Sequence, residues 1–391
     1  MYHYSQRLPW NFSSNLLSRR ASERRSRGQA IIDLTRSNPT SVLSNYPHQQ
    51  IADAFASIKN FHYEPDPLGM ESARIAVAQY YEPRGITVSP GRLLLTASTS
   101  EAYALLFKLL CDAGDEILVP APSYPLFDFL ARLESVRVKN YRLEFDGEWY
   151  IDFDFLQRQI TSGTRAIVLV NPNNPTGSFL KHREFQTLSR IAQERSIPLI
   201  SDEVFFDYAF DSQAGRVPTL IRQDEILSFS LNGLSKAAGM PQMKLGWIAI
   251  NGSPAGQTGA RERLELIADT YLSVGAPVQR ALPRLFTIGA EIGREIHERT
   301  KRNLQRLHEI LHDSPAHALR CEGGWSAIIR LPATQPEESW TLHLLEQCGI
   351  LVQPGYFFDM TSEPYIVVSL ITPPDEFEQA ILRIHEAVLA R

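Results

Sequence analysis

Two adjacent carboxylates, Asp202 and Glu203, end a short apolar run that is typical of a buried strand (PLISDE, residues 198–203). Carboxylates at the end of a buried strand are costly unless a cation or hydrogen-bond donors stabilise them. A further strand-like run is followed by Lys236 in the stretch NGLSKAAG (232–239). The small neighbours let another group approach the amine closely, which an ordinary surface lysine does not require. These residue types suit acid–base and nucleophilic chemistry.

Two further loops carry polar groups after predicted strands. Ser98, Thr99 and Ser100 stand where a helix is expected to begin. Consecutive hydroxyls and free N–H groups there can bind an anion, although Ser and Thr are also the commonest helix caps. The loop NPNNPTG (171–177) contains two X-Pro steps and a final Gly, so it is stiff and presents Asn side chains such as Asn174.

The elements that position these loops follow one pattern. From about residue 90, short runs rich in Val, Ile and Leu alternate with stretches of helical length. This pattern predicts an α/β fold with a mostly parallel sheet and helices on both faces. Ligands of such sheets bind at the carboxyl ends of the strands, so we expect the loops to meet there. The predicted strands are 92–98, 116–120, 136–143, 166–170, 198–202, 226–231 and 245–250.

The pattern changes after Pro277, which predicts a second and smaller α+β domain. A long charged helix is expected over roughly 277–312, strands near 325–331 and 364–370, and a closing helix from Pro374. The predicted divisions are an N-terminal segment that joins the small domain (1–45), a large domain (46–276) and a small C-terminal domain (277–391).

Composition limits the possible functions. The chain has 391 residues, of which 43% are hydrophobic and 21% charged, so it is an ordinary globular protein and not a disordered one. A net charge of −5 gives no reason to expect nucleic acid or an anionic membrane as partner. Three scattered cysteines argue against a disulfide framework, and no apolar run has the length of a membrane span. We therefore expect a cytoplasmic protein that acts on small molecules.

An arginine-rich segment (residues 19–27) could be a transit peptide or a basic arm. Leu16 and Leu17 precede it and Gly28 ends it. We interpret it instead as the exposed face of a first helix.

Together these motifs resemble those of the fold-type I pyridoxal-phosphate enzymes, specifically the class I/II aminotransferases such as those that act on aspartate or histidinol phosphate. The resemblance extends from SNPT (37–40) to PG (354–355), almost the whole chain. It implies an aspartate aminotransferase-like fold, bound pyridoxal 5'-phosphate, and an amino donor with a keto or aldehyde acceptor. The motifs, in the family's order, are YEPDPLG (63–69), GDE (114–116), PAPSYP (120–125), NPNNPTG (171–177), DE (202–203), SK (235–236) and KLGW (244–247).

The resemblance also implies a role for each site residue. Asp202 would pair with the protonated ring nitrogen of the cofactor, and Lys236 would form the Schiff base and then carry a proton. Tyr124 would stack on the ring as the third catalytic residue, and Asn174 would form a hydrogen bond with the ring hydroxyl. Asn38, Arg36 and Asn174 would bind the substrate, and we expect no metal site. The phosphate would be held by Ser98, Thr99, Ser100, Ser235 and Lys244, and by Tyr63 from the neighbouring subunit of a homodimer.

Three positions depart from the family's pattern. Phe205 replaces a Tyr, which removes a hydrogen bond to the ring hydroxyl and is expected to raise the pKa of the lysine–cofactor linkage. Lys244 replaces an Arg but keeps the charge. Val367 stands where an Arg usually binds the substrate α-carboxylate, and no Arg or Lys lies between Leu331 and Leu382. Either the substrate amine is not next to a carboxylate, or another cation takes over, with Arg36 the nearest candidate.

Other functions were weighed against an aminotransferase. The same cofactor supports elimination and cyclisation, so a lyase or cyclase acting on a modified amino acid is the main alternative. The run HEILH (308–312) matches the H-E-x-x-H pattern of zinc metallopeptidases, but no third ligand follows at a familiar spacing. Aminotransferase-like regulators carry a DNA-binding module, for which the roughly 35 residues before SNPT are too few.

Overall fold

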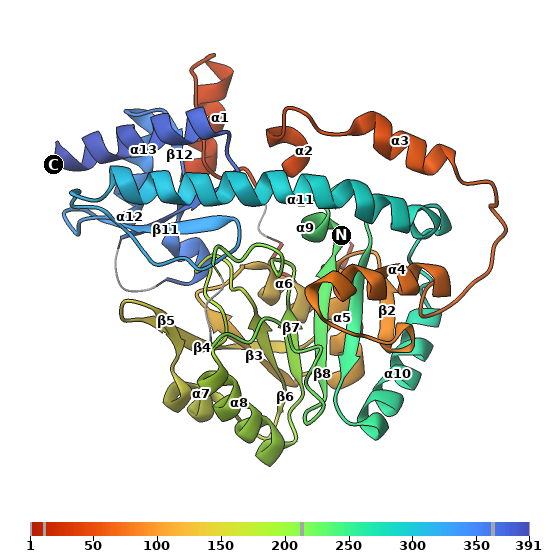
Figure 1. Cartoon of the computed structure of the whole chain (residues 1–391). Coiled ribbons are helices and arrows are strands. Elements are labelled where there is room, and N and C mark those ends of the chain that lie inside the picture. Colours follow the sequence, from red (N-terminus) through yellow and green to blue (C-terminus); the bar gives the residue numbers. More distant parts are fainter. Residues whose placement is uncertain (1, 11–12, 212–214, 361–363, 391) are drawn as a thin grey trace.

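The computed structural model describes residues 2–10, 13–211, 215–360 and 364–390. Within these residues the largest sheet has eight strands in the order β2-β9-β8-β7-β6-β3-β4-β5 (Figure 1). The pairs from β8 to β4 are parallel, whereas β9 is antiparallel to both neighbours and β5 is antiparallel to β4. The strands are β2 (Leu93–Thr96), β3 (Glu116–Ala121), β4 (Arg137–Phe145), β5 (Trp149–Ile151), β6 (Thr164–Val170), β7 (Leu199–Asp202), β8 (Ser228–Gly233) and β9 (Gly246–Asn251).

The predicted α/β fold with a mostly parallel sheet is confirmed, and all seven predicted strands form. The short strand β5 was not predicted, because three residues are too few for a periodic pattern. The antiparallel direction of β9 was not predicted either, since a buried apolar run has the same composition in both directions.

Helices cover both faces of this sheet, which explains its continuous apolar strands. On β9, Ile248 and Ile250 pack against α5 and α10, whereas the alternate residues Trp247 and Ala249 pack against α4 and α11. The helices of this part are α4 (Glu71–Tyr81), α5 (Thr99–Leu110), α6 (Leu126–Leu133), α7 (Phe153–Gln159), α8 (His182–Arg195), α9 (Leu234–Ala237) and α10 (Pro254–Asp269).

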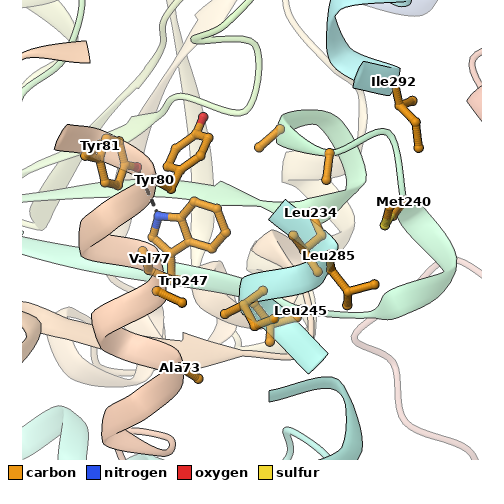
Figure 2. Packing of buried hydrophobic residues seen from close by; sticks show 14 of the residues in the cluster. Ala73, Val77, Tyr80, Tyr81, Leu234, Met240, Leu245, Trp247, Leu285 and Ile292 are labelled. Carbon is orange, nitrogen blue, oxygen red and sulfur yellow. Dashed lines mark hydrogen bonds between the residues drawn. The ribbon is translucent and has the colours of Figure 1, made fainter. Parts of the chain in front are cut away.

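Trp247 anchors the packing on the α4 side of the sheet (Figure 2). Its ring lies edge-on to Tyr80 and Tyr81 of α4, with centroid distances of 5.6 and 6.3 Å. The indole N–H of this fully buried residue donates to the hydroxyl of Tyr81 at 3.0 Å. This contact holds α4 against β9, the strand that directly follows the loop of Lys236 and Lys244.

Helix α11 (Ala276–Ile310) joins the two parts of the molecule, as Figure 1 shows. Its first half contributes Leu285 and Ile292 to the core beneath the large sheet, and its second half contributes Leu304 and Leu307 to a separate core. That second core is formed with an antiparallel sheet of order β10-β11-β14-β13. Its other elements are β10 (His317–Ala318), β11 (Ser326–Arg330), α12 (Glu337–Glu346), β13 (Gln353–Pro354), β14 (Tyr365–Ser369) and α13 (Pro374–Leu389).

The N-terminal segment lies against this smaller part. In α1 (Leu16–Ser26), Leu17 and Ala21 pack with Leu345, and most of the helix's arginines are exposed, which confirms the predicted first helix. Strand β1 (Ile32–Asp33) pairs in parallel with β12 (Ile350–Leu351). The helices α2 (Pro39–Val42) and α3 (His48–Ala56) then lead to α4. The domain divisions at 45 and 276 remain predictions. None of the described helices is long and apolar enough to cross a membrane.

Candidate active site

The loops after β2, β3, β6, β7 and β8 meet at the carboxyl edge of the sheet, as predicted from the strand pattern. Together with strands of the small sheet they enclose a cavity of about 310 Å³. Nine of the predicted site residues line it: Ser98, Thr99, Ser100, Tyr124, Asn174, Asp202, Ser235, Lys236 and Lys244.

Three predicted site residues do not line this cavity. The guanidinium of Arg36 pairs with Glu376 of α13 and also donates to the carbonyl of Asp33. Asn38 caps α2, where its side-chain oxygen accepts from the N–H and the hydroxyl of Thr40. Both side chains are engaged elsewhere in this structure, and their role in binding the substrate remains a prediction.

Tyr63 lies on an extended segment before α4, and 70% of its side chain is exposed. It borders a different recess, beside Met70 and Tyr271. Within one chain it therefore does not reach the cavity. Its predicted position in a neighbouring subunit's site remains a prediction.

Asp202 ends β7 and is held by two donors. One carboxylate oxygen accepts from the hydroxyl of Tyr103 at 3.1 Å, and the other accepts from the N–H of Val204 at 3.2 Å. Burial raises the pKa of Asp202 to about 6, and the two hydrogen bonds and nearby Lys236 oppose that rise. The carboxylate is therefore mostly ionised at neutral pH.

The neighbouring Glu203 faces a different environment. It is buried, and its carboxylate accepts from the hydroxyls of Thr219 and Ser230 and from the N–H of Leu220. It does not line the cavity, and its contacts give it a structural role.

Lys236 lies in α9, directly after β8. Its ammonium nitrogen is 4.5 Å from the ring centroid of Trp325 and 5.6 Å from that of Phe205. Burial lowers the pKa of Lys236 to about 8, and the charge of Asp202 partly offsets this effect. A lysine with a pKa this close to neutral loses its proton readily, which suits a nucleophile.

Because the amine of Lys236 is buried, we expect it to lower the free energy of unfolding of the cofactor-free protein. Below pH 8 Lys236 is protonated in the folded and the unfolded state, so the full cost of its burial applies, about 3 kcal/mol for a pKa lowered from 10.5 to about 8. Between pH 8 and 10.5 the folded state loses the proton first, and the cost shrinks. We expect Lys236→Met to be more stable than the parent at pH 7 and equally stable near pH 10.5. Urea unfolding at several pH values tests this; a pH-independent difference would contradict it.

The opposite end of the cavity can bind an anion. Ser98 caps α5 by accepting from the N–H of Glu101 at 3.1 Å, so the first N–H groups of this helix face the loop without intrahelical partners. Ser235 and Lys244 line the same cavity, and Lys244 adopts a left-handed backbone conformation (φ 50°) just before β9. Ser98 is therefore the helix cap, which was one of the two roles predicted for this loop. The N–H groups of the following residues remain available to an anion, so the other predicted role, an anion site, is compatible with the structure.

Comparison with known proteins gives the family. A model of the aminotransferases of class I and II matches residues 30–384. The chain belongs to the class I and II aminotransferases. It is 26% identical to a glutamate-pyruvate aminotransferase of Haemophilus influenzae over 91% of this chain and 90% of that one. It is 33% identical to the tyrosine aminotransferase of Mus musculus, over 57% of this chain and 50% of that one.

Solved aminotransferase structures share the whole fold. The alanine aminotransferase of Pyrococcus furiosus superposes with a TM-score of 0.88 at 25% identity, over 100% of both chains. A mutant of the Thermus thermophilus aspartate aminotransferase gives a TM-score of 0.83 at 22% identity, over 99% of this chain and 100% of that one. The predicted aspartate aminotransferase-like fold is confirmed.

Aminotransferases of this family use pyridoxal 5'-phosphate, and the cavity fits that group. The cavity places a buried carboxylate, a lysine with a lowered pKa and an exposed aromatic ring, Tyr124, together with an anion site at a helix N-terminus. These are the partners that a pyridine ring, a carbonyl carbon and a phosphate require. When bound, the cofactor supplies an electron sink for the carbanion that forms next to the substrate nitrogen.

Tyr103, which lines the cavity and donates a hydrogen bond to Asp202, was not predicted from the sequence. Tyr103 stands four residues after Thr99 on α5, a spacing that places both on one helix face and could have revealed it. Replacing Tyr103 with Phe removes a donor to a charged group, so the pKa of Asp202 should rise above about 6. We expect the affinity for pyridoxal phosphate to fall by about tenfold, and by more at pH 6 than at pH 8. Titration of the cofactor at both pH values is the measurement, and equal losses at both would contradict the role.

Two departures from the aminotransferase pattern lie in or beside the cavity. Phe205 lines it and packs edge-on against Trp325 at a centroid distance of 5.5 Å. Tyr208 does not replace the missing hydroxyl, because its own hydroxyl donates to the carbonyl of Lys236 at 2.7 Å. Val367 is buried in an apolar cluster with Ile328 and Phe358, where it makes no polar contact.

The zinc alternative finds no support. Helix α11 ends at Ile310, so His312 lies beyond it and pairs with Asp313, while Glu309 is engaged by Gln305 and Arg306. In the described part of the chain, no group of three or more His, Cys, Asp or Glu side chains is arranged to hold a metal.

Proposed function

We propose that this aminotransferase takes its amino group from a donor whose amine is not held through a cation-bound α-carboxylate. The observation that carries the proposal is the set of charges around the cavity. Among the described residues that line it, only Asp202, Lys236 and Lys244 are charged. The two lysines are needed for the cofactor, which leaves a substrate carboxylate without a charge-assisted partner.

In this proposal each residue has one task. Asp202 keeps the ring nitrogen of the cofactor protonated, with Tyr103 and Val204 holding the carboxylate in place. Lys236 would hold the cofactor through its amine and, once released, could take up and return the proton of the substrate carbon. Tyr124 covers the ring, and Asn174 donates to its hydroxyl. Ser98, Thr99, Ser100, Ser235 and Lys244 bind the phosphate.

The experiment is a panel of amino donors, half with an α-carboxylate and half without one. The cofactor's absorbance follows its conversion to the aminated form. Conversion only by the carboxylate-free amines supports the proposal. Rapid conversion by ordinary α-amino acids such as alanine, glutamate or tyrosine would overturn it, and the family's usual substrates would apply.

A lyase or cyclase acting on a modified amino acid is the second candidate, and the observation in its favour is Phe205. Without a hydroxyl at this position, the ring hydroxyl of the cofactor has one donor fewer, which changes the electron sink. Elimination or cyclisation leaves the cofactor unaminated while the donor is consumed. Measuring donor loss beside the absorbance therefore separates the two reactions.

We also infer a homodimer in a reducing compartment such as the cytoplasm. The exposed side chains of Phe61 and Tyr63 (67% and 70%) lie on an extended segment beside the exposed Tyr271, which supports a contact with a second copy. The three cysteines, Cys111, Cys321 and Cys348, are scattered along the chain and odd in number, which supports the compartment. Sedimentation should give twice the chain mass of 44.2 kDa, and a monomer at working concentration would refute the dimer.

A further inference from the structure

The small-sheet wall of the cavity carries uncharged hydrogen-bonding side chains in two adjacent rows. In one row Gln353 of β13 pairs with Val367 of β14, which pairs in turn with Ile328 of β11. In the next row Ser369 pairs with Ser326. Because side chains alternate along a strand, Val367 and Ser369 share a face, and Gln353, Ser326 and Ser369 all line the cavity.

Gln353 is the free member of this wall. It is half-buried, and no hydrogen bond joins its amide to another described residue. The two serines already use their protons, since Ser369 donates to the carbonyl of Arg36 and Ser326 donates to the side-chain oxygen of Asn174 at 3.1 Å. The wall therefore offers one amide, which both donates and accepts, and two hydroxyl oxygens that accept.

This wall suits a neutral group and not a carboxylate. Gln353 is the direct cross-strand neighbour of Val367, the position where the family's arginine is expected, and Val367 itself is packed among apolar side chains. A carboxylate here would meet acceptor oxygens and a single neutral donor, so its charge would be poorly compensated. A hydroxyl or carboxamide both donates and accepts, and it can satisfy Gln353 and the serine oxygens together.

We propose that Gln353 determines specificity, and that the substrate is a primary amine with an uncharged hydrogen-bonding group, a hydroxymethyl or a carboxamide, where an α-amino acid carries its carboxylate. This inference rests on the proposed function. The rest of the cavity wall includes Leu126, Phe127, Leu130 and Phe358, which suits an apolar substituent on the same molecule.

The test uses the cofactor-loaded protein and ligands that lack the amine and cannot react: 3-phenylpropan-1-ol, 3-phenylpropanamide and 3-phenylpropanoate. Calorimetry measures their dissociation constants. We expect the alcohol or the amide to bind at least about tenfold more tightly than the carboxylate. A tenfold difference is about what one hydrogen bond contributes to binding. Comparing the dissociation constants of the alcohol and the amide shows which of the two neutral groups the wall binds more tightly.

Variants assign the effect to Gln353. Gln353→Glu has nearly the same shape but replaces the donor with a negative charge. The neutral ligands can still donate to it and should change little, whereas the carboxylate ligand should weaken by about tenfold or more, so the preference should widen. Gln353→Arg should bring the carboxylate above the neutral ligands. The control is Gln347→Glu, the same chemical change at an exposed position of the small domain, which should alter nothing.

Three results would overturn the inference. Tighter binding of the carboxylate to the parent protein is the first, and unchanged preference in both Gln353 variants is the second. Failure of pyridoxal phosphate to attach to Lys236 is the third, and it would remove the proposed function as well. In the first two cases the protein is loaded, so the proposed cofactor chemistry stands and only the substrate class is wrong.

Discussion

Replacing Lys236 with alanine is expected to lower turnover by about 10⁴-fold or more. The side chain is the proposed attachment point of the cofactor and, among the described residues that line the cavity, the one amine next to Trp325 and Phe205. Positioned proton transfer alone contributes about 10²–10⁴-fold, and loss of the covalent attachment adds to that. The measurement is steady-state turnover with the best donor from the panel, on protein saturated with pyridoxal phosphate.

The matched control for this change is Lys301→Ala, which removes an exposed lysine of α11 and should leave turnover within twofold of the parent. Far-UV circular dichroism checks that both variants are folded. If Lys236→Ala kept more than about a tenth of the parent's activity, Lys236 would not be the catalytic amine.

Replacing Asp202 with asparagine is expected to lower turnover by about 10²–10³-fold. Asparagine keeps the size and can still accept from Tyr103 and Val204, but it lacks the charge that, in the proposed function, keeps the ring nitrogen protonated. Removing one fixed group that stabilises developing charge in a buried site costs about this much. The loss should appear in kcat as well as in kcat/KM, because the charge is needed during the reaction.

The adjacent carboxylate supplies the control. Glu203 is buried among Thr219, Leu220 and Ser230 and does not line the cavity. Glu203→Gln should therefore lower the melting temperature, and at temperatures where the variant is folded its kcat should be nearly that of the parent. Opposite results for the two variants, with kcat lost at 203 and kept at 202, would show that the carboxylates had been assigned the wrong roles.

The large sheet and most of the site could be predicted because they depend on local sequence. Each strand end carries its own loop, and Asp202 or Lys236 reaches the cavity through the strand directly before it. The parallel topology then brings these loops together without any further information. The same reasoning placed the hydroxyls of residues 98–100 at the start of a helix.

The rest of the site depends on contacts between distant segments. Arg36 was a candidate substitute cation because it adjoins the SNPT motif, but its ion pair with Glu376, 340 residues away, could not be predicted from the sequence. Gln353 was missed because its place beside Val367 follows from the register of β13 on β14, and a two-residue strand leaves no periodic pattern to read. Apolar alternation gives the faces of a strand, whereas its partner and register are decided by tertiary packing.

The most direct test of the account is to locate the lysine that holds the cofactor. Protein incubated with pyridoxal phosphate is reduced with borohydride, digested and mapped by mass spectrometry. We expect one cofactor per chain, on the peptide that contains Lys236, and no modification in Lys236→Ala. Attachment at Lys244 or spread over surface lysines, or no attachment at all, would contradict the assignment of this cavity as the catalytic centre.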